Sequence, residues 1–143
     1  MQRKASANWQ GGLKGGKGTV STGSGVLSRT QYSFGTRFES GEGTNPEELI
    51  AAAHASCFAM ALSAQLESAG MTAQNLDVTC TITLDKRDTG WEVTESHLEL
   101  TARIPDADRE KFESAAASAK SGCPISRLLN TKITLNASLA AQA

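Results

Sequence analysis

Cys57 is the residue best placed to do chemistry, because it lies in an apolar segment that is expected to form a buried helix. A thiol in such a place is either inert packing or a nucleophile kept away from water. Glu47 and His54 are expected on the same side of the helix, because each residue turns it by about 100°. An acid, an imidazole and a thiol over about two and a half turns are unusual for a plain core helix.

Activation of this thiol requires a charged partner. A cysteine nucleophile must be a thiolate, and burial raises the pKa of a thiol, so Cys57 needs a cation or strong hydrogen-bond donors nearby. His54 is one candidate. Arg37, expected in a strand that leads to the helix, is the better permanent cation. Glu47 would orient its guanidinium, so that an Arg37–Glu47 pair lowers the pKa of Cys57 and donates hydrogen bonds to a substrate oxygen.

Each of these residues also has a plain structural interpretation. Cys57 can be a small buried hydrophobe, and His54 a structural residue. Arg37 can be a surface residue of its strand, and Glu47 a partner of the helix dipole. The combination weakens these interpretations more than any single residue does.

The other two cysteines have different settings. Cys80 falls in an alternating pattern typical of a half-buried strand, and is expected to face the core as packing. Cys123 precedes Pro124, where a short helix is expected to begin, and would occupy the N-cap, which favours a thiolate. Three cysteines without a C-x-x-C pair, and no apolar leader, predict a cytoplasmic protein with reduced thiols.

Composition restricts the partners. The 143 residues fit one domain over residues 1–143. The net charge of −1 argues against nucleic-acid and polybasic membrane binding. The longest apolar run, about 49–62, contains His54 and is too short to span a bilayer. The glycine-rich stretch 11–18 lacks the hydroxyl residue of a phosphate-binding loop, and is expected to form a hairpin turn.

The expected elements position these residues. A cap at Asn45 and a stop at Gly70 predict the long helix. The elements, in chain order, are short antiparallel strands that include one around 33–38, a helix over about 46–69, strands over 78–84 and 91–104 with a bulge near 94–96, a helix from 105 to 122, a short helix over 124–129 and a strand over 133–139. This order predicts an α+β fold with a mainly antiparallel sheet.

Four segments carry a resemblance to a known family: residues 15–27, 36–38, 43–58 and 121–126. Together they resemble the OsmC/Ohr family of thiol peroxidases, and its OsmC branch specifically. The similarity spans essentially the whole chain in the right order. It implies one OsmC-like domain with a long buried central helix, assembled as an intertwined homodimer.

The resemblance also implies an activity, the reduction of organic hydroperoxides without cofactor or metal. Cys57 matches the peroxidatic cysteine, which becomes a sulfenic acid, and Cys123 the resolving cysteine, which condenses with it to a disulfide. Arg37 and Glu47 match the supporting pair, and Arg37 can serve Cys57 of the partner chain. The implied reductant is a small or lipoyl-type dithiol.

Two other interpretations stay open. The chain can be a binding module that sequesters apolar hydroperoxides or lipids, with incidental thiols. His54 and Cys57, three residues apart on a helix, can also be metal ligands with Cys123 or His97. A zinc site usually has more ligands in short pairs, which disfavours this second alternative.

Overall fold

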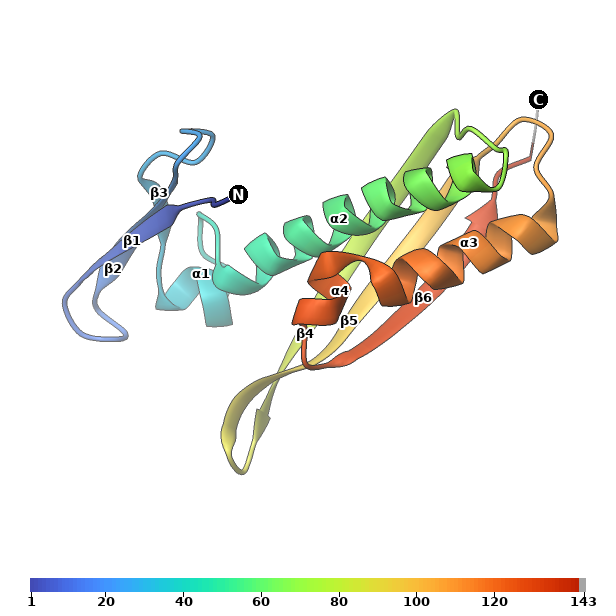
Figure 1. Cartoon of the computed structure of the whole chain (residues 1–143). Helices are drawn as coiled ribbons and strands as arrows, with labels where there is room; N and C mark the ends of the chain where they lie inside the picture. The colour runs from blue at the N-terminus through green and yellow to red at the C-terminus, as the bar shows by residue number, and fades with distance from the viewer. Residues whose placement is uncertain (142–143) are drawn as a thin grey trace. The chain divides into compact units, whose positions relative to one another are not determined.

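The computed structural model describes residues 1–141, and the chain divides into two compact units, Met1–Leu49 and Ile50–Ala143. Each unit is described by itself, and Figure 1 labels the elements of both. The single domain over residues 1–143 stays a prediction, and its last two residues lie outside the described residues.

The first unit contains a three-stranded antiparallel sheet in the order β1-β2-β3. Its strands are β1 (Ala5–Gln10), β2 (Lys17–Thr22) and β3 (Thr30–Tyr32). The predicted hairpin is confirmed, because the glycine-rich stretch joins β1 to β2. Gly18 allows close packing there, since a Cβ at this position would lie 2.6 Å from the Tyr32 ring and 2.7 Å from the Trp9 ring.

A short helix, α1 (Phe34–Phe38), replaces the strand predicted around residues 33–38. That prediction was wrong because a capping box decides the local structure. The Ser33 backbone N–H donates to Thr36 Oγ1 at 2.8 Å, and the Thr36 backbone N–H donates to Ser33 Oγ at 3.3 Å. These bonds override the strand propensity of the aromatic and β-branched residues. Arg37 therefore lies in the last turn of a helix.

The long helix α2 (Pro46–Ser68) begins and ends where the sequence predicts. Asn45 caps its start, because Asn45 Oδ1 accepts the Glu48 backbone N–H at 2.8 Å. At its end the Met71 N–H donates to the Leu66 carbonyl at 2.9 Å, and Gly70 has a φ of 80°. This left-handed glycine is the usual helix stop.

The second unit contains another three-stranded sheet, so the strands form two sheets. It consists of β4 (Asn75–Arg87), β5 (Gly90–Arg103) and β6 (Lys132–Leu139), where β4 and β5 pair antiparallel and β5 and β6 pair parallel. Thr83 pairs with Glu95 and Leu84 with Val93, which leaves Thr94 as the extra residue of a bulge. The bulge predicted near residues 94–96 is thus confirmed.

Helices cover one face of this second sheet (Figure 1). They are the main part of α2, α3 (Arg109–Gly122) and α4 (Pro124–Leu128). The core between helices and sheet includes Phe58, Leu62 and Leu66 of α2, Phe112 and Ala116 of α3, and Leu98 and Leu100 of β5. This packing places the middle of α2 against β5 and the α3–α4 junction.

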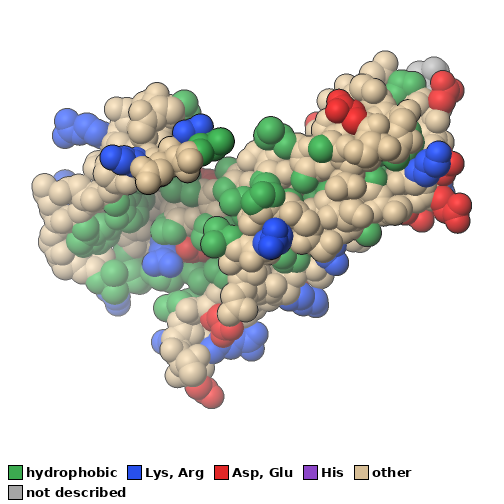
Figure 2. Space-filling view, viewed as in Figure 1, with side chains coloured by type: hydrophobic (Ala, Val, Ile, Leu, Met, Phe, Trp, Pro, Cys, Tyr) green, Lys and Arg blue, Asp and Glu red, His purple; other side chains and the backbone are tan. Residues whose placement is uncertain are grey.

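Burial of α2 is one-sided in the single chain. Its buried residues, His54, Phe58, Leu62 and Leu66, follow each other at intervals of four and form one stripe. Met60, outside the stripe, is 76% exposed, and Figure 2 shows hydrophobic side chains at the surface over this region. By length and composition alone α2 could cross a membrane, a test that core helices of soluble proteins also pass. The helix predicted to be buried is therefore buried on one face only.

Candidate active site

The second unit brings Cys57 and Cys123 together. Cys57 is half-buried on α2, and Cys123 is fully buried at the junction of α3 and α4. Both are free thiols, and the Cys57 S–H donates a hydrogen bond to Cys123 Sγ. The two thiols therefore lie close enough for each to influence the ionisation of the other.

The surroundings of the two thiols move their pKa values in opposite directions. Burial raises the pKa of Cys57, and so does the hydrogen bond to Cys123. Burial opposes the charge on Cys123 too, but hydrogen bonds from Cys57 and Ser126 outweigh it and lower the pKa of Cys123. The surroundings in the single chain therefore favour the charged form of Cys123 over that of Cys57.

Cys123 is the N-cap of α4, as the sequence predicts. Its Sγ accepts the Ser126 backbone N–H at 3.5 Å and the Ser126 hydroxyl at 3.6 Å. Pro124 takes the first helical position, where its missing N–H costs nothing. The helix start thus supplies two hydrogen-bond donors to the Cys123 sulfur.

The first unit contains the Arg37–Glu47 ion pair. Arg37 Nε donates to Glu47 Oε1 at 2.7 Å and Arg37 Nη2 donates to Glu47 Oε2 at 3.3 Å, so the pair is bidentate. The Glu47 side chain is 12% exposed and that of Arg37 39% exposed. The carboxylate therefore fixes the guanidinium while part of it stays accessible.

Arg37 also lines an apolar pocket of about 280 Å³ in the first unit. The other lining residues are Trp9, Leu13, Tyr32, Ser33, Phe34, Phe38 and Pro46. The guanidinium carbon lies 5.2 Å from the centre of the Phe38 ring, a cation–π contact. A cation at the wall of an aromatic pocket suits a ligand that combines one polar group with an apolar body.

His54 is completely buried between two serine hydroxyls. Its Nδ1 lies 2.6 Å from Ser96 Oγ on β5, and its Nε2 lies 2.7 Å from Ser126 Oγ on α4. Burial lowers the pKa of His54, so the imidazole is neutral at physiological pH. Both ring nitrogens are engaged, which leaves neither for the metal alternative.

Cys80 packs against the core as predicted, but it also joins this polar cluster. Its Sγ lies 3.2 Å from Ser96 Oγ. His97, the other proposed metal ligand, bonds Thr134 and Glu99. Within residues 1–141, no group of three or more His, Cys, Asp or Glu side chains is placed to hold a metal ion.

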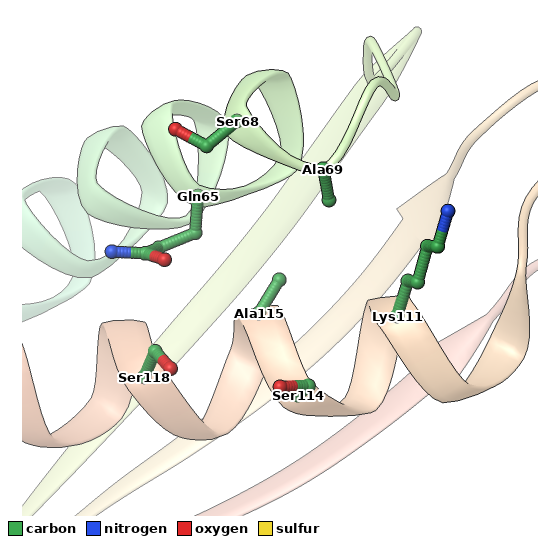
Figure 3. Close-up of a pocket in the computed structure, with 7 residues that line it drawn as sticks. All are labelled: Gln65, Ser68, Ala69, Lys111, Ser114, Ala115 and Ser118. Carbon is green, nitrogen blue, oxygen red and sulfur yellow. The ribbon is translucent and has the colours of Figure 1, made fainter.

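A groove of about 270 Å³ runs between α2 and α3 in the second unit (Figure 3). Its lining includes Gln65 and Ser68 of α2 and Lys111, Ser114 and Ser118 of α3. Its α2 residues belong to the C-terminal end of that helix, and no cysteine is among the lining residues. The groove is therefore separate from the thiol pair.

Comparison with known proteins identifies the family. The model of the OsmC-like protein family matches residues 39–138. This chain belongs to the OsmC-like family. The resemblance to OsmC/Ohr proteins is thereby confirmed.

The relatives of this OsmC-like chain include named peroxide-resistance proteins. It is 48% identical over 136 residues to peroxiredoxin OsmC of Escherichia coli (strain K12), covering 95% of each chain. It is 28% identical over 116 residues to organic hydroperoxide resistance protein OhrB of Bacillus subtilis (strain 168), covering 80% of this chain and 83% of OhrB. The crystal structure of OhrB superimposes with a TM-score of 0.69 at 25% identity, covering 94% of this chain and 97% of OhrB.

Ser96 and Ser126 are the site residues that sequence reasoning missed. A single serine in a strand or a short helix gives no local signal of a distant partner. Ser126 falls in the segment 121–126 that resembles OsmC proteins, which was the one available hint. Only the fold of the OsmC-like chain shows that His54 lies between these two serines.

The buried neutral His54 predicts a pH dependence of stability. The unfolded chain binds a proton to this residue near pH 6.5, the usual value, whereas burial opposes protonation in the folded protein. The stability contribution is therefore present above that pH and is lost as the pH falls toward the lower folded pKa. We expect a decrease of at most about 1.4 kcal/mol per pH unit from this one group.

Urea unfolding between pH 5 and pH 8 measures this slope. His54→Gln should flatten it. Parallel pH curves for the His54→Gln variant and the unmodified OsmC-like protein would contradict the prediction.

Proposed function

We propose that this chain is a thiol peroxidase that reduces organic hydroperoxides to alcohols. The observation that carries the proposal is the pair of free thiols, Cys57 and Cys123, joined by a hydrogen bond beside a helix start. The relatives named peroxiredoxin OsmC and organic hydroperoxide resistance protein support it. In this proposal Cys57 is the peroxidatic cysteine and Cys123 the resolving cysteine.

The first half-reaction uses the proton that the two thiols share. Cys57 passes its proton to the Cys123 thiolate and becomes the nucleophile. The Cys57 sulfur then attacks the distal peroxide oxygen, so that an S–O bond forms and the O–O bond breaks. The alkoxide takes the proton from Cys123 and leaves as the alcohol. Cys57 is now a sulfenic acid, and Cys123 is again a thiolate.

Resolution and recycling complete the cycle. The Cys123 thiolate attacks the Cys57 sulfur, the S–S bond forms, and the departing hydroxide takes a proton from solvent to give water. A dithiol then reduces the disulfide by two exchange steps and becomes a disulfide itself. The dithiol, of small or lipoyl type, supplies the two electrons that reduce the peroxide. Such turnover requires the reducing conditions of the cytoplasm.

Arg37 is the proposed cation and hydrogen-bond donor of the site, and Glu47 holds it in place. The guanidinium offsets the effect of burial on Cys57 and donates hydrogen bonds to the peroxide oxygens. Glu47 lies nearly three turns before Cys57 on α2. Because of this separation along the helix, we propose that the Arg37–Glu47 pair acts on Cys57 of a second copy. The apolar face of α2 left exposed in the single chain supports the proposed intertwined homodimer.

The aromatic pocket beside Arg37 supports the substrate class. A volume of about 280 Å³ suits an organic group rather than hydrogen peroxide, which has no apolar part to bury. The test is turnover of cumene hydroperoxide and of hydrogen peroxide with dihydrolipoamide as the reductant. We expect faster consumption of the organic peroxide. Binding of the organic peroxide without consumption would contradict the proposal and favour the binding module.

Arg37→Ala should slow peroxide reduction by about 100-fold, the usual loss when a preorganised donor to a reacting oxygen is removed. Stopped-flow mixing with cumene hydroperoxide measures the rate of Cys57 oxidation. Arg109→Ala is the matched control, since it removes an exposed arginine that pairs with Glu113 on α3. Equal rates for Arg37→Ala and this control would remove Arg37 from the mechanism.

Subunit mixing tests the proposed dimer. A heterodimer of a Cys57→Ser chain and an Arg37→Ala chain contains one intact pair of Cys57 and Arg37 only if the two residues act across the interface. We expect the co-refolded mixture to regain activity that neither variant has alone. No recovery in a mixture shown to contain heterodimers would place both residues of a site in one chain.

A further inference from the structure

A continuous line of polar side chains connects Cys123 to the interior of the second unit. It runs from Cys80 through Ser96, His54 and Ser126 to Cys123. The successive distances are 3.2 Å, 2.6 Å, 2.7 Å and 3.6 Å. The mechanism above uses only the last member, so the other four need a reason to be there.

Proton counting gives this line a direction. The Ser126 hydroxyl has one proton and donates it to Cys123 Sγ, so toward His54 its oxygen must accept. His54 Nε2 therefore carries the proton of the neutral imidazole, and His54 Nδ1 is the acceptor. Ser96 must then donate its proton to Nδ1 and accept from the Cys80 thiol. Every other member of the line donates toward Cys123, so the line favours a negative charge on the Cys123 sulfur.

We propose that His54 is a positioning residue that, through Ser126, holds Cys123 as a thiolate. This inference rests on the proposed function and deepens it, because it says how the resolving cysteine is kept ready. The neutral imidazole donates to Ser126 and thereby makes the Ser126 hydroxyl a better donor to the sulfur. Ser96 fixes the tautomer that makes this possible. The titratable members of the line are Cys80 on β4, His54 on α2 and Cys123, and Cys57 on α2 bonds Cys123.

The line also determines which sulfur the reductant attacks. In thiol–disulfide exchange the sulfur that is the more stable thiolate leaves more readily. The reductant thiolate therefore attacks Cys57, the bond between Cys57 and Cys123 breaks, and the electron pair goes to Cys123. The Ser126 hydroxyl donates a hydrogen bond to the Cys123 thiolate that leaves. The mixed disulfide thus forms on half-buried Cys57 rather than on fully buried Cys123.

The first test measures the thiolate at Cys123 without any peroxide. In a Cys57→Ser background, the Cβ chemical shift of ¹³C-labelled Cys123 is followed from pH 4 to pH 10 by NMR, which needs no access to the buried sulfur and separates Cys123 from Cys80. Ser126→Ala should move the midpoint of the curve to higher pH by about one pH unit, a tenfold change in the ionisation equilibrium, as expected for loss of one donor to a charged group. Ser121→Ala removes an exposed hydroxyl that donates to carbonyls of its own helix, and should leave the curve in place.

A second variant tests the relay beyond direct contact. Ser96 does not touch Cys123, yet Ser96→Ala should shift the Cys123 curve in the same direction, because the tautomer is no longer fixed. If Ser96 had only a structural role, its replacement would not shift the Cys123 curve. An unchanged Cys123 curve in a folded Ser126→Ala or Ser96→Ala variant would overturn the proposal.

The third test needs no variant. Nitrogen-15 NMR of the reduced protein should show His54 neutral with its proton on Nε2 between pH 6 and pH 8. A proton on Nδ1, or a charged ring, would overturn the proposal. These readouts are independent of the activity: if cumene hydroperoxide fails to oxidise Cys57, the peroxidase proposal fails, whereas the titration and the tautomer still decide the role of His54.

Discussion

Replacing Cys57 with serine will abolish the reduction of cumene hydroperoxide. A serine hydroxyl at this position stays protonated at neutral pH and cannot form the sulfenic acid, so no electrons reach the peroxide. We expect a loss of at least about 1,000-fold, as for removal of other catalytic nucleophiles. Loss of peroxide with excess dithiol, followed by a ferric–xylenol orange assay, measures the effect.

The control for this variant is Ser56→Ala, an exposed neighbour on α2 whose hydroxyl donates to the Ala53 carbonyl. It should keep the parent rate. Full turnover by the Cys57→Ser protein would contradict the mechanism, because neither of the remaining thiols, Cys80 and Cys123, attacks the peroxide in it.

Cys123→Ser will allow one oxidation and then stop. Cys57 can still attack the peroxide, but no thiolate lies beside it to resolve the sulfenic acid. The first step should also slow, because serine is a poor acceptor for the Cys57 proton. We expect about one equivalent of peroxide consumed per chain, and a turnover rate at least about 100-fold below the parent, since resolution by the external dithiol lacks the proximity that Cys123 provides.

Dimedone, which reacts with sulfenic acids, measures this outcome. It should label Cys57 in the Cys123→Ser protein after one equivalent of cumene hydroperoxide. Peptide mass spectrometry locates the label. Sustained turnover at the parent rate would show that Cys123 is not the resolving residue.

Features fixed by neighbouring residues could be predicted from the sequence. Asn45 and Gly70 mark the ends of α2, and Pro124 marks the start of α4 with Cys123 at its cap. The alternation that breaks near Thr94 located the bulge. In each case the physical cause lies within a few residues, so no knowledge of the fold is needed.

Features that depend on distant contacts could not be predicted this way. The approach of Cys57 to Cys123, and of His54 to Ser96 and Ser126, joins elements far apart in the chain. The resemblance to OsmC/Ohr proteins supplied the cysteine pairing, but nothing marked the serines. The α1 helix was missed for another reason: a serine–threonine capping box was outweighed in the prediction by strand-forming residues.

The central claim is that Cys57 and Cys123 form a disulfide when they reduce an organic hydroperoxide. The most direct test is intact and peptide mass spectrometry of the reduced protein after one equivalent of cumene hydroperoxide, with hydrogen peroxide in parallel. The account predicts rapid loss of two hydrogens, a peptide linking Cys57 to Cys123, a slower reaction with hydrogen peroxide, and Cys80 still open to alkylation. If Cys57 and Cys123 both remain alkylatable after the organic peroxide, the claim is contradicted.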